Sequence, residues 1–540
     1  MTSTALIDSW ASYGPRPDKD PEERFTLQHL LEDMEWAGIS AALVRHTQMA
    51  QYDVMHVNLR LIQEIAPHRN KLFPCWTVLP HHFGDFPAPK ELISQMKRND
   101  VRAVYFQPAA NAYPVVKELL SPLARVLNPG RTLILTTFEQ LGSNYNSIIS
   151  FCKIFHKCPI LIGQVSWGEQ RLVTAVMNSC PNVHIEFHLL QANRAVEHFA
   201  EKFGINRLLF GTGLMHHSPG AARGFIDWTL LNEKETAQFS GGNIMRLLQS
   251  PHTIPAQSPS TPDSYISAAS MQKPLSGLIL DAHCHVLDDG LNCGGKGYVM
   301  IRGDIENMIT LNKRMGITAA AMMSWSGTVC MDVSAGNALI ENITDRFPGQ
   351  VIGLSSCDPT HQSAEEINEV CMHLHKKKLF CGLKPYYTNN LSYAHPLYEP
   401  YFKFADTENL YGLFHVAPAS GGMDAIHTLA QKYPGMTIII AHSGGRWAFA
   451  RQVAHAVNTY PNVMAELTLT PVPNGIIEWL CAQTGSDRIL FGTDAPMRDP
   501  RPQLGWCVYT RLSQTDKEKI LGLNFKTVLQ RSAQGRALRL

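Results

Sequence analysis

Three short stretches of this chain occur twice, in the same order along the sequence. Arg207–Gly213 matches Arg488–Asp494 at five of seven positions, Pro181–Glu186 matches Pro461–Glu466, and Gly38–Ala42 matches Gly316–Ala320. The offsets are 281, 280 and 278 residues, so the matches are collinear with small insertions. Collinear repeats of this kind indicate a tandem duplication of one fold rather than two unrelated α/β domains.

The segment between the two copies, residues 250–274, has the composition of a linker. It is rich in Ser, Pro, Thr and Ala and has no periodic apolar residues. We therefore predict two domains, residues 1–249 and residues 275–540, joined by this linker. Each has the size of one large α/β domain.

Composition excludes several classes of protein. The 540 residues carry 47 Lys and Arg against 46 Asp and Glu, a formal net charge of +1. Proteins that bind nucleic acids or membrane surfaces usually have a basic excess, so neither partner is expected. No apolar run approaches the ~18 residues of a membrane span. The 12 Cys are scattered, as is typical of reduced thiols in a cytoplasmic protein.

The second copy alternates β-rich runs with helical segments. Eight runs are strand candidates: Leu278–Leu280, Ile317–Met323, Val351–Ser356, Cys381–Lys384, Gly412–His415, Thr437–Ala441, Val463–Leu467 and Arg488–Phe491. A capping box at residues 363–366 opens one of the intervening helices. Eight such units predict a (βα)8 barrel, and the duplication predicts two in tandem. A doubly wound open sheet is the alternative, but no Gly-rich phosphate turn follows the first strand.

Residues with ligand chemistry follow the ends of these predicted strands. They are His283, His285, Lys384, His415, His442 and Asp494. Successive strand ends of a barrel converge on one mouth, so we expect a single site. Two imidazoles on one strand face, a further His and a carboxylate suit Zn²⁺, with Mn, Fe or Co as alternatives. Water activated by such a metal is a nucleophile at neutral pH.

These residues lie in five motifs that resemble the amidohydrolase superfamily. The motifs are Asp281–His285, Gly382–Lys384, Phe414–His415, Ile440–Gly445 and Phe491–Asp494. They are most similar to its amidohydrolase-related branch, which includes metal-dependent hydrolases and decarboxylases.

The resemblance implies a role for each residue of the set. The implied metal ligands are His283, His285, His415 and Asp494. The resemblance makes His442 a catalytic histidine close to the metal.

Lys384 is the third implied catalytic residue, beside Asp494 and His442. It would either be carboxylated and bridge two metals or hold a substrate anion, and we favour one divalent metal. Five further side chains that follow strand ends are candidates for the substrate pocket: Trp325, Tyr386, Tyr387, Arg446 and Arg498.

The predicted reaction is attack of metal-activated water on an amide, ester or lactone carbonyl of a small carboxylate-bearing substrate. Asp494 would act as proton shuttle and His442 as electrophile or acid. The alternative in the same branch is non-oxidative decarboxylation, in which His442 and Asp494 deliver a proton to carbon. The alternative from another class is a non-catalytic binding or assembly protein.

The first copy has lost the ligand set. When Asp8 is aligned with Asp281, the six positions hold Trp10, Ser12, Gln107, Thr136, Gln164 and Gly213. None of these is a good zinc ligand. We therefore predict a pseudoenzyme barrel that packs on the C-terminal barrel as in a homodimer, and further homo-oligomerisation stays open.

Overall fold

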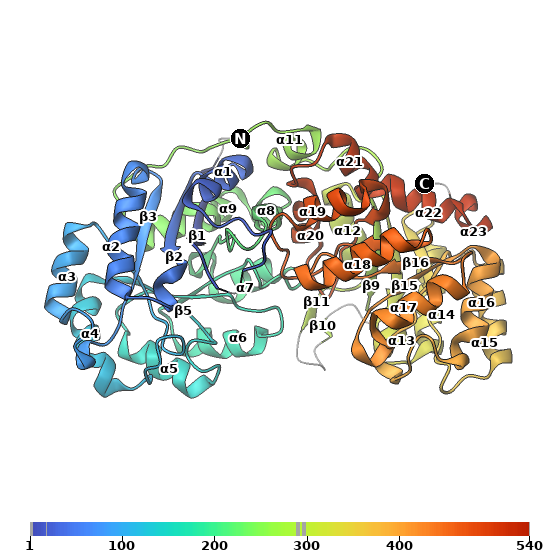
Figure 1. The fold of residues 1–540 in the computed structure, drawn as a ribbon, viewed down its shortest axis with the longest axis horizontal. Helices are drawn as coiled ribbons and strands as arrows, with labels where there is room; N and C mark the ends of the chain where they lie inside the picture. The colour runs from blue at the N-terminus through green and yellow to red at the C-terminus, as the bar shows by residue number, and fades with distance from the viewer. Residues whose placement is uncertain (1–3, 18, 288–291, 294–298, 539–540) are drawn as a thin grey trace. The chain divides into compact units, whose positions relative to one another are not determined.

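Two eight-stranded parallel sheets make up the core of this chain. The computed structural model describes residues 4–17, 19–287, 292–293 and 299–538. The chain divides into two compact units, one ending at Pro262 and the other beginning at Asp263. In each unit the strands of the sheet follow one another in chain order, and helices surround them (Figure 1).

The first sheet comprises β1 (Ile7–Tyr13), β2 (Ala41–His46), β3 (Leu72–Thr77), β4 (Ala103–Tyr105), β5 (Leu133–Thr137), β6 (Ile160–Gly163), β7 (Val183–Glu186) and β8 (Leu208–Leu209). The second comprises β9 (Leu280–Val286), β12 (Ala319–Ser324), β13 (Val351–Ser355), β14 (Gly382–Leu383), β15 (Tyr411–Phe414), β16 (Thr437–Ile440), β17 (Val463–Glu466) and β18 (Ile489–Leu490). A separate antiparallel pair joins β10 (Asn292–Cys293) to β11 (Met300–Ile301).

The helices of the first unit are α1 (Leu27–Ala37), α2 (Val54–Ile65), α3 (Pro89–Arg98), α4 (Lys117–Gly130), α5 (Tyr145–Ile154), α6 (Gln170–Ser179), α7 (Ala195–Phe203), α8 (Pro219–Asp227), α9 (Glu233–Ala237) and α10 (Asn243–Leu247). Those of the second are α11 (Ser264–Ser270), α12 (Ile305–Met315), α13 (Trp325–Val329), α14 (Val333–Arg346), α15 (Ala364–Cys371), α16 (Glu399–Glu408), α17 (Gly422–Lys432), α18 (Trp447–Thr459), α19 (Ile476–Thr484), α20 (Pro500–Val508), α21 (Gln514–Glu518), α22 (Asn524–Gln530) and α23 (Ala533–Ala537).

Backbone hydrogen bonds join the first strand of each sheet to the segment after its last strand. In the first unit, Ser12 N donates to Leu214 O at 2.7 Å. In the second, Ala282 N donates to Phe491 O at 3.0 Å and His285 N to Ala495 O at 2.6 Å. The predicted fold, two tandem TIM-barrel-like α/β domains, is confirmed.

The first strand of the second barrel is longer than predicted. It does not end at Leu280 but runs to Val286, so His283 and His285 lie within β9. The extension is stabilised by pairing with β12 and by the bond to Ala495, partners that are distant in sequence. A strand boundary set by such partners cannot be read from local composition.

The segment expected to be a linker is ordered and is divided between the units. Gln257 N donates to Ser40 Oγ in the first unit at 3.0 Å. The second part folds as helix α11, which Asp263 caps by accepting a hydrogen bond from Ile266 N. Asp263 also pairs with Lys517 Nζ at 2.6 Å, which ties α11 to the second unit.

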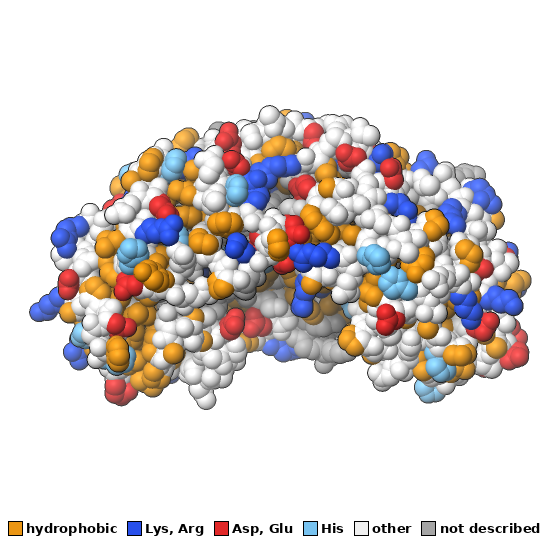
Figure 2. All heavy atoms as spheres, viewed as in Figure 1, with side chains coloured by type: hydrophobic (Ala, Val, Ile, Leu, Met, Phe, Trp, Pro, Cys, Tyr) orange, Lys and Arg blue, Asp and Glu red, His pale blue; other side chains and the backbone are white. Residues whose placement is uncertain are grey.

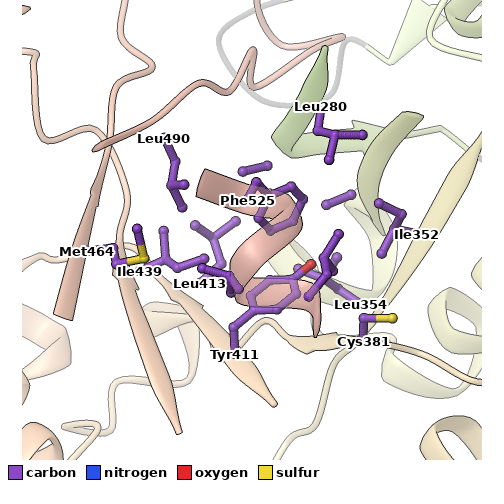
Figure 3. Packing of buried hydrophobic residues seen from close by; sticks show 14 of the residues in the cluster. Leu280, Ile352, Leu354, Cys381, Tyr411, Leu413, Ile439, Met464, Leu490 and Phe525 are labelled. Carbon is purple, nitrogen blue, oxygen red and sulfur yellow. The ribbon is translucent and has the colours of Figure 1, made fainter. Parts of the chain in front are cut away.

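A dense apolar layer fills the second barrel (Figure 3). Phe525 of α22 is completely buried and packs edge-to-face on Tyr411 at the start of β15, with 5.3 Å between ring centroids. Leu280, at the start of β9, belongs to the same cluster. Helix α22 thus closes the end of the barrel at which the strands begin, and the opposite end is left for polar side chains.

Charged side chains of both signs are intermixed over the face shown in Figure 2. This distribution agrees with the net charge of +1. Among the residues that the structure describes, no helix combines the length and the apolar character needed to cross a bilayer.

A buried histidine behind β13 makes the second barrel sensitive to acid. His375 Nδ1 donates to Phe380 O at 2.8 Å, and its Nε2 accepts from Ser355 Oγ at 2.8 Å. Burial lowers the pKa of His375 from 6.5 to about 4, although the bond to Phe380 opposes the shift. Between these values the unfolded chain binds a proton and the folded chain does not, so stability falls as the pH falls.

We expect the shifted pKa of His375 to lower the free energy of unfolding by up to about 3 kcal/mol as the pH falls from 6.5 to 4. Chemical denaturation across this range should show a shallower pH dependence for H375Q than for the unmodified chain. The matched control is H373Q, because His373 lies on the same helical segment but is exposed and bonded to Glu341. Equal slopes for H375Q and the unmodified chain would contradict the assignment.

Candidate metal centre

The predicted ligand residues meet at the mouth of the second barrel. Each lies on the last part of a strand or directly after one: His283 and His285 on β9, Lys384 after β14, His415 after β15, His442 after β16 and Asp494 after β18. The carboxyl ends of barrel strands converge at one face, and this explains how residues 211 positions apart come together.

Three of these side chains form the tightest group. His283, His442 and Asp494 each offer a ligand atom, and these atoms lie within 4.8 Å of one another. His285 joins the group through Asp494, whose Oδ1 is 3.3 Å from His285 Nε2 and 3.4 Å from His283 Nε2. Both imidazoles of β9 therefore face the same carboxylate, as the i, i+2 spacing predicts.

A buried glutamate that the sequence analysis did not single out orients this group. Glu466, at the end of β17, accepts from His283 Nδ1 at 3.0 Å and from His442 N at 3.2 Å. It also accepts from Thr468 N at 2.8 Å. Burial raises the pKa of Glu466, and the neighbouring His442 and the hydrogen bonds to Thr468 act against that shift. The one sequence signal was the repeat itself, since Glu186 ends the matching stretch of the first copy.

Hydrogen bonds determine which ring nitrogen of His283 and of His442 carries the proton. His283 Nδ1 faces the Glu466 carboxylate, and His442 Nδ1 lies 2.9 Å from Thr468 O, a carbonyl that can only accept. Both Nδ1 atoms therefore carry the proton, and Nε2 is the basic nitrogen of each neutral ring. Burial holds the pKa of His283 well below its usual value and lowers that of His442 to about 3, so both rings are neutral at pH 7.

Asp494 is an ionised carboxylate in this group. Burial alone would raise its pKa, but Arg498, His283 and His285 hold it well below the usual value. Ligand atoms of two imidazoles and one carboxylate thus lie close together, with Lys384 beside His283 and Arg498 paired with Asp494. This donor set fits a divalent transition metal. The residue also has φ of +54°, a left-handed conformation that is costly for a non-glycine residue and often occurs at functional sites.

Lys384 and His415 flank the tight group. Lys384 is buried, with Nζ 3.5 Å from His283 Nε2, and burial lowers its pKa to about 8. The ring of His415 lies 4.7 Å from that of His442 and 5.0 Å from that of Tyr387. Burial lowers the pKa of His415 to about 2, so this ring is also neutral. His415 lies outside the group of 4.8 Å, and its role as a ligand stays a prediction.

The candidate substrate residues separate into two groups. Trp325 packs against His285 with ring centroids 5.2 Å apart, and Tyr386 and Tyr387 pack against His415. The two arginines lie in different surroundings. Arg446 is exposed at the start of α18. Arg498 is buried in an ion pair with Asp494 and donates from Nε to Thr470 Oγ1 at 2.8 Å.

The first barrel repeats the frame of this site with different contents. Asp281 Oδ1 accepts from His283 N and Thr493 N at 2.9 and 3.0 Å. Asp8 Oδ1 accepts from Trp10 N and Thr212 N at 2.8 and 3.0 Å. Trp10 therefore has the backbone position of His283, and Gly213 follows Thr212 as Asp494 follows Thr493.

Gln164 is likewise the counterpart of His442. Both have positive φ, +56° and +63°, and both donate from the backbone N to the buried glutamate that ends the next strand. Among the described residues of the first barrel, no three His, Cys, Asp or Glu side chains come together as they do around Asp494.

The strand register corrects two counterparts that sequence alignment assigns. Thr137 pairs with Gly163, which precedes Gln164, just as His415 lies beside Ala441 before His442. Thr137, not Thr136, is therefore the counterpart of His415. Alignment missed this because the two copies differ by small insertions between their matching stretches.

The same register moves the counterpart of Lys384. Tyr105 pairs with Leu135, and Leu383 pairs with Gly412, which sets Lys384 beside Leu413. Tyr105, not Gln107, therefore occupies the position of Lys384.

Comparisons with known proteins found one family model and several similar solved structures. An amidohydrolase family model matches residues 281–529. One similar solved structure is an uncharacterised TIM-barrel protein from Bordetella bronchiseptica, with 15% identity, a TM-score of 0.39, and coverage of 47% of this chain and 99% of that one. No curated protein matches the sequence at a significant level.

Two further similar structures are decarboxylases. A dihydroxybenzoic acid decarboxylase from Polaromonas sp., with bound manganese and 2-nitroresorcinol, has 16% identity and a TM-score of 0.38, and the match covers 48% of this chain and 99% of that one. A 5-carboxyvanillate decarboxylase from Novosphingobium aromaticivorans, complexed with manganese and 4-hydroxy-3-methoxy-5-nitrobenzoic acid, has 13% identity and a TM-score of 0.38, and covers 46% and 95%.

The metal-ligand cluster and the family match thus fall on the same barrel, and the C-terminal half of this chain, residues 281–529, belongs to the amidohydrolase family.

Proposed function

We propose that the C-terminal barrel is a metal-dependent hydrolase that adds water to an amide, ester or lactone carbonyl of a small carboxylate-bearing substrate. The observation that carries this proposal is the convergence of ligand atoms of His283, His442 and ionised Asp494 within 4.8 Å of one another, with His285 beside the same carboxylate. Imidazole nitrogens and a carboxylate oxygen at this spacing are a donor set that a divalent transition metal takes. The family match supports the same reaction class.

One divalent metal would be held by His283, His285, His442 and Asp494, with His415 as a further candidate. Imidazole and carboxylate donors favour Zn²⁺, and Mn, Fe and Co accept the same set. When bound, such a metal lowers the pKa of water and polarises a carbonyl oxygen.

The side chains around the metal position have distinct chemical states. Asp494 is ionised and can accept the proton of the attacking water. His442 presents a neutral ring whose Nδ1 proton is engaged by Thr468 O, so it acts as a ligand or base rather than as the acid in the resting state. Lys384, with a pKa of about 8, retains positive charge at pH 7 and is placed to hold a substrate anion.

The N-terminal barrel, residues 1–249 in the predicted division, would have no part in this chemistry. The positions of His283, His442 and Asp494 hold Trp10, Gln164 and Gly213, none of which binds zinc well. We also propose a cytoplasmic location, because every cysteine whose state the structure describes is a free thiol.

Metal content gives the first test. We expect the purified full-length chain to hold about one divalent metal per molecule by elemental analysis, because the ligand set occurs once. H283A and D494N should each lose most of it, since each removes one of the three converging ligands. H373A is the matched control, an exposed histidine that should leave the metal content unchanged. A metal-free chain, or unchanged metal in H283A, would favour a non-catalytic binding protein.

Glu466 gives the second test. It accepts hydrogen bonds at both oxygens, and a glutamine would replace one acceptor with a donor that faces an N–H group. We therefore expect E466Q to weaken metal binding by about 10–100-fold in titrations against a competing chelator. E369Q, at an exposed position of α15, should bind as the unmodified chain does. If E466Q binds the metal as tightly as the unmodified chain, Glu466 does not contribute to the metal site.

The reaction itself is tested on metal-loaded protein. Small lactones and amides bearing a carboxylate should be hydrolysed, and D494N should lower kcat by at least about 10²–10⁴-fold, because it removes a metal ligand as well as the proton acceptor. Release of CO₂ from the carboxylate panel without hydrolysis would favour the decarboxylase alternative. H373A should keep full activity, and the Tm of D494N measured beside that of the unmodified chain shows whether this variant folds.

A further inference from the structure

A buried arginine stands at the mouth of the first barrel, next to the position that the second barrel gives to its metal ligands. Arg45 lies near the end of β2 and pairs with Ser12, while its counterpart Met323 pairs with His285. Met323 is fully buried and apolar, so the first barrel has gained a cation where the second has a methionine.

The guanidinium of Arg45 is enclosed by aromatic rings. Its central carbon lies 3.9 Å from the Trp10 ring centroid and 4.5 Å from that of Tyr105. These two side chains hold the positions of His283 and Lys384 in the second barrel. The first barrel thus supplies, from the corresponding strands, an aromatic frame for one positive charge.

No carboxylate balances this charge among the described residues. The side chain is 8% exposed, its Nε has no hydrogen-bond partner, and no described Asp or Glu oxygen forms an ion pair with it. Aromatic faces attract a cation but accept none of its in-plane N–H bonds well, and a buried donor without an acceptor destabilises the fold. Nε is thus an in-plane donor that lacks an acceptor, and the donor edge of a guanidinium matches a carboxylate.

The same mouth has a second buried polar atom without a partner. Other residues at this mouth are exposed. His188, after β7, uses Nδ1 to contact Glu186 at 2.7 Å, while its Nε2 is buried and has no partner. Gln164, which replaces His442, is exposed, and Tyr105 is half-buried. Tyr105 is therefore partly exposed, and its ring lies beside the guanidinium.

We propose that the mouth of the N-terminal barrel binds a small organic carboxylate with an apolar body, whose carboxylate is held by Arg45 and whose body lies against Tyr105. This site is distinct from the metal centre and does not depend on its chemistry. On this proposal the first copy lacks the metal ligands and has the guanidinium of Arg45 at the same mouth, where it binds an anion.

Calorimetric titration of the full-length chain with benzoate, in the presence of a chelator, tests this proposal. Saturable binding is expected, and R45M should weaken it about tenfold or more, because it removes a charge-assisted bidentate contact. Methionine is the residue of the other barrel at this position and should fit the space. K384M is the control for the C-terminal site and should leave benzoate binding to the N-terminal barrel unchanged.

A conservative variant keeps the test decisive if R45M does not fold. R45K preserves the charge but not the planar fork, so it should fold and still bind benzoate more weakly than the unmodified chain. Benzoate should raise the Tm of the unmodified chain and not that of R45M. The proposal is overturned if benzoate shows no saturable binding, if R45M and R45K bind it as the unmodified chain does, or if inorganic phosphate binds and benzoate does not.

Discussion

Each barrel of this protein depends on one buried aspartate that joins its first strand to the segment after its last. Asp281 accepts from Thr493 N and from Thr493 Oγ1, the latter at 2.5 Å, and Asp8 makes the same bonds to Thr212. A carboxylate that accepts several donors at once holds two distant segments in one geometry. Burial raises the pKa of both aspartates, and the hydrogen bonds of their threonines oppose that shift.

This closure sets which side chains can meet. The residue two positions after each aspartate faces the residue that follows each threonine, which gives His283 with Asp494 in one barrel and Trp10 with Gly213 in the other. The buried glutamates extend the parallel, since Glu466 and Glu186 both accept from the backbone N of a residue that follows the preceding strand. The scaffold is therefore common to both copies, and the difference in chemistry comes from a few side chains placed within it.

Much of this organisation follows from sequence, because barrel strand ends converge and duplicated motifs reveal their own alignment. His283, His285, His442 and Asp494 could be brought together on that basis. Glu466 could not, since a strand-terminal glutamate has no local signature. Arg498 was expected to contact the substrate. Its guanidinium instead pairs with Asp494, four residues earlier in the chain. The register between strands assigns Tyr105 and Thr137 as the counterparts of Lys384 and His415. This register depends on insertions that short motifs do not locate.

The glycine at the position of Asp494 has a consequence for how the two copies can change. Gly213 has a positive φ, as Asp494 does, and a Cβ there would approach His188 and His217 to 2.5 and 2.6 Å. Trp10 similarly fills the space beside Gly163. No single substitution can rebuild the ligand set, because several ligand positions hold other residues and the one at Gly213 is closed by His188 and His217. The side chains that now surround Gly213 therefore hinder a return of the first barrel to metal binding. An aspartate at position 213 would also require a change at His188 or His217.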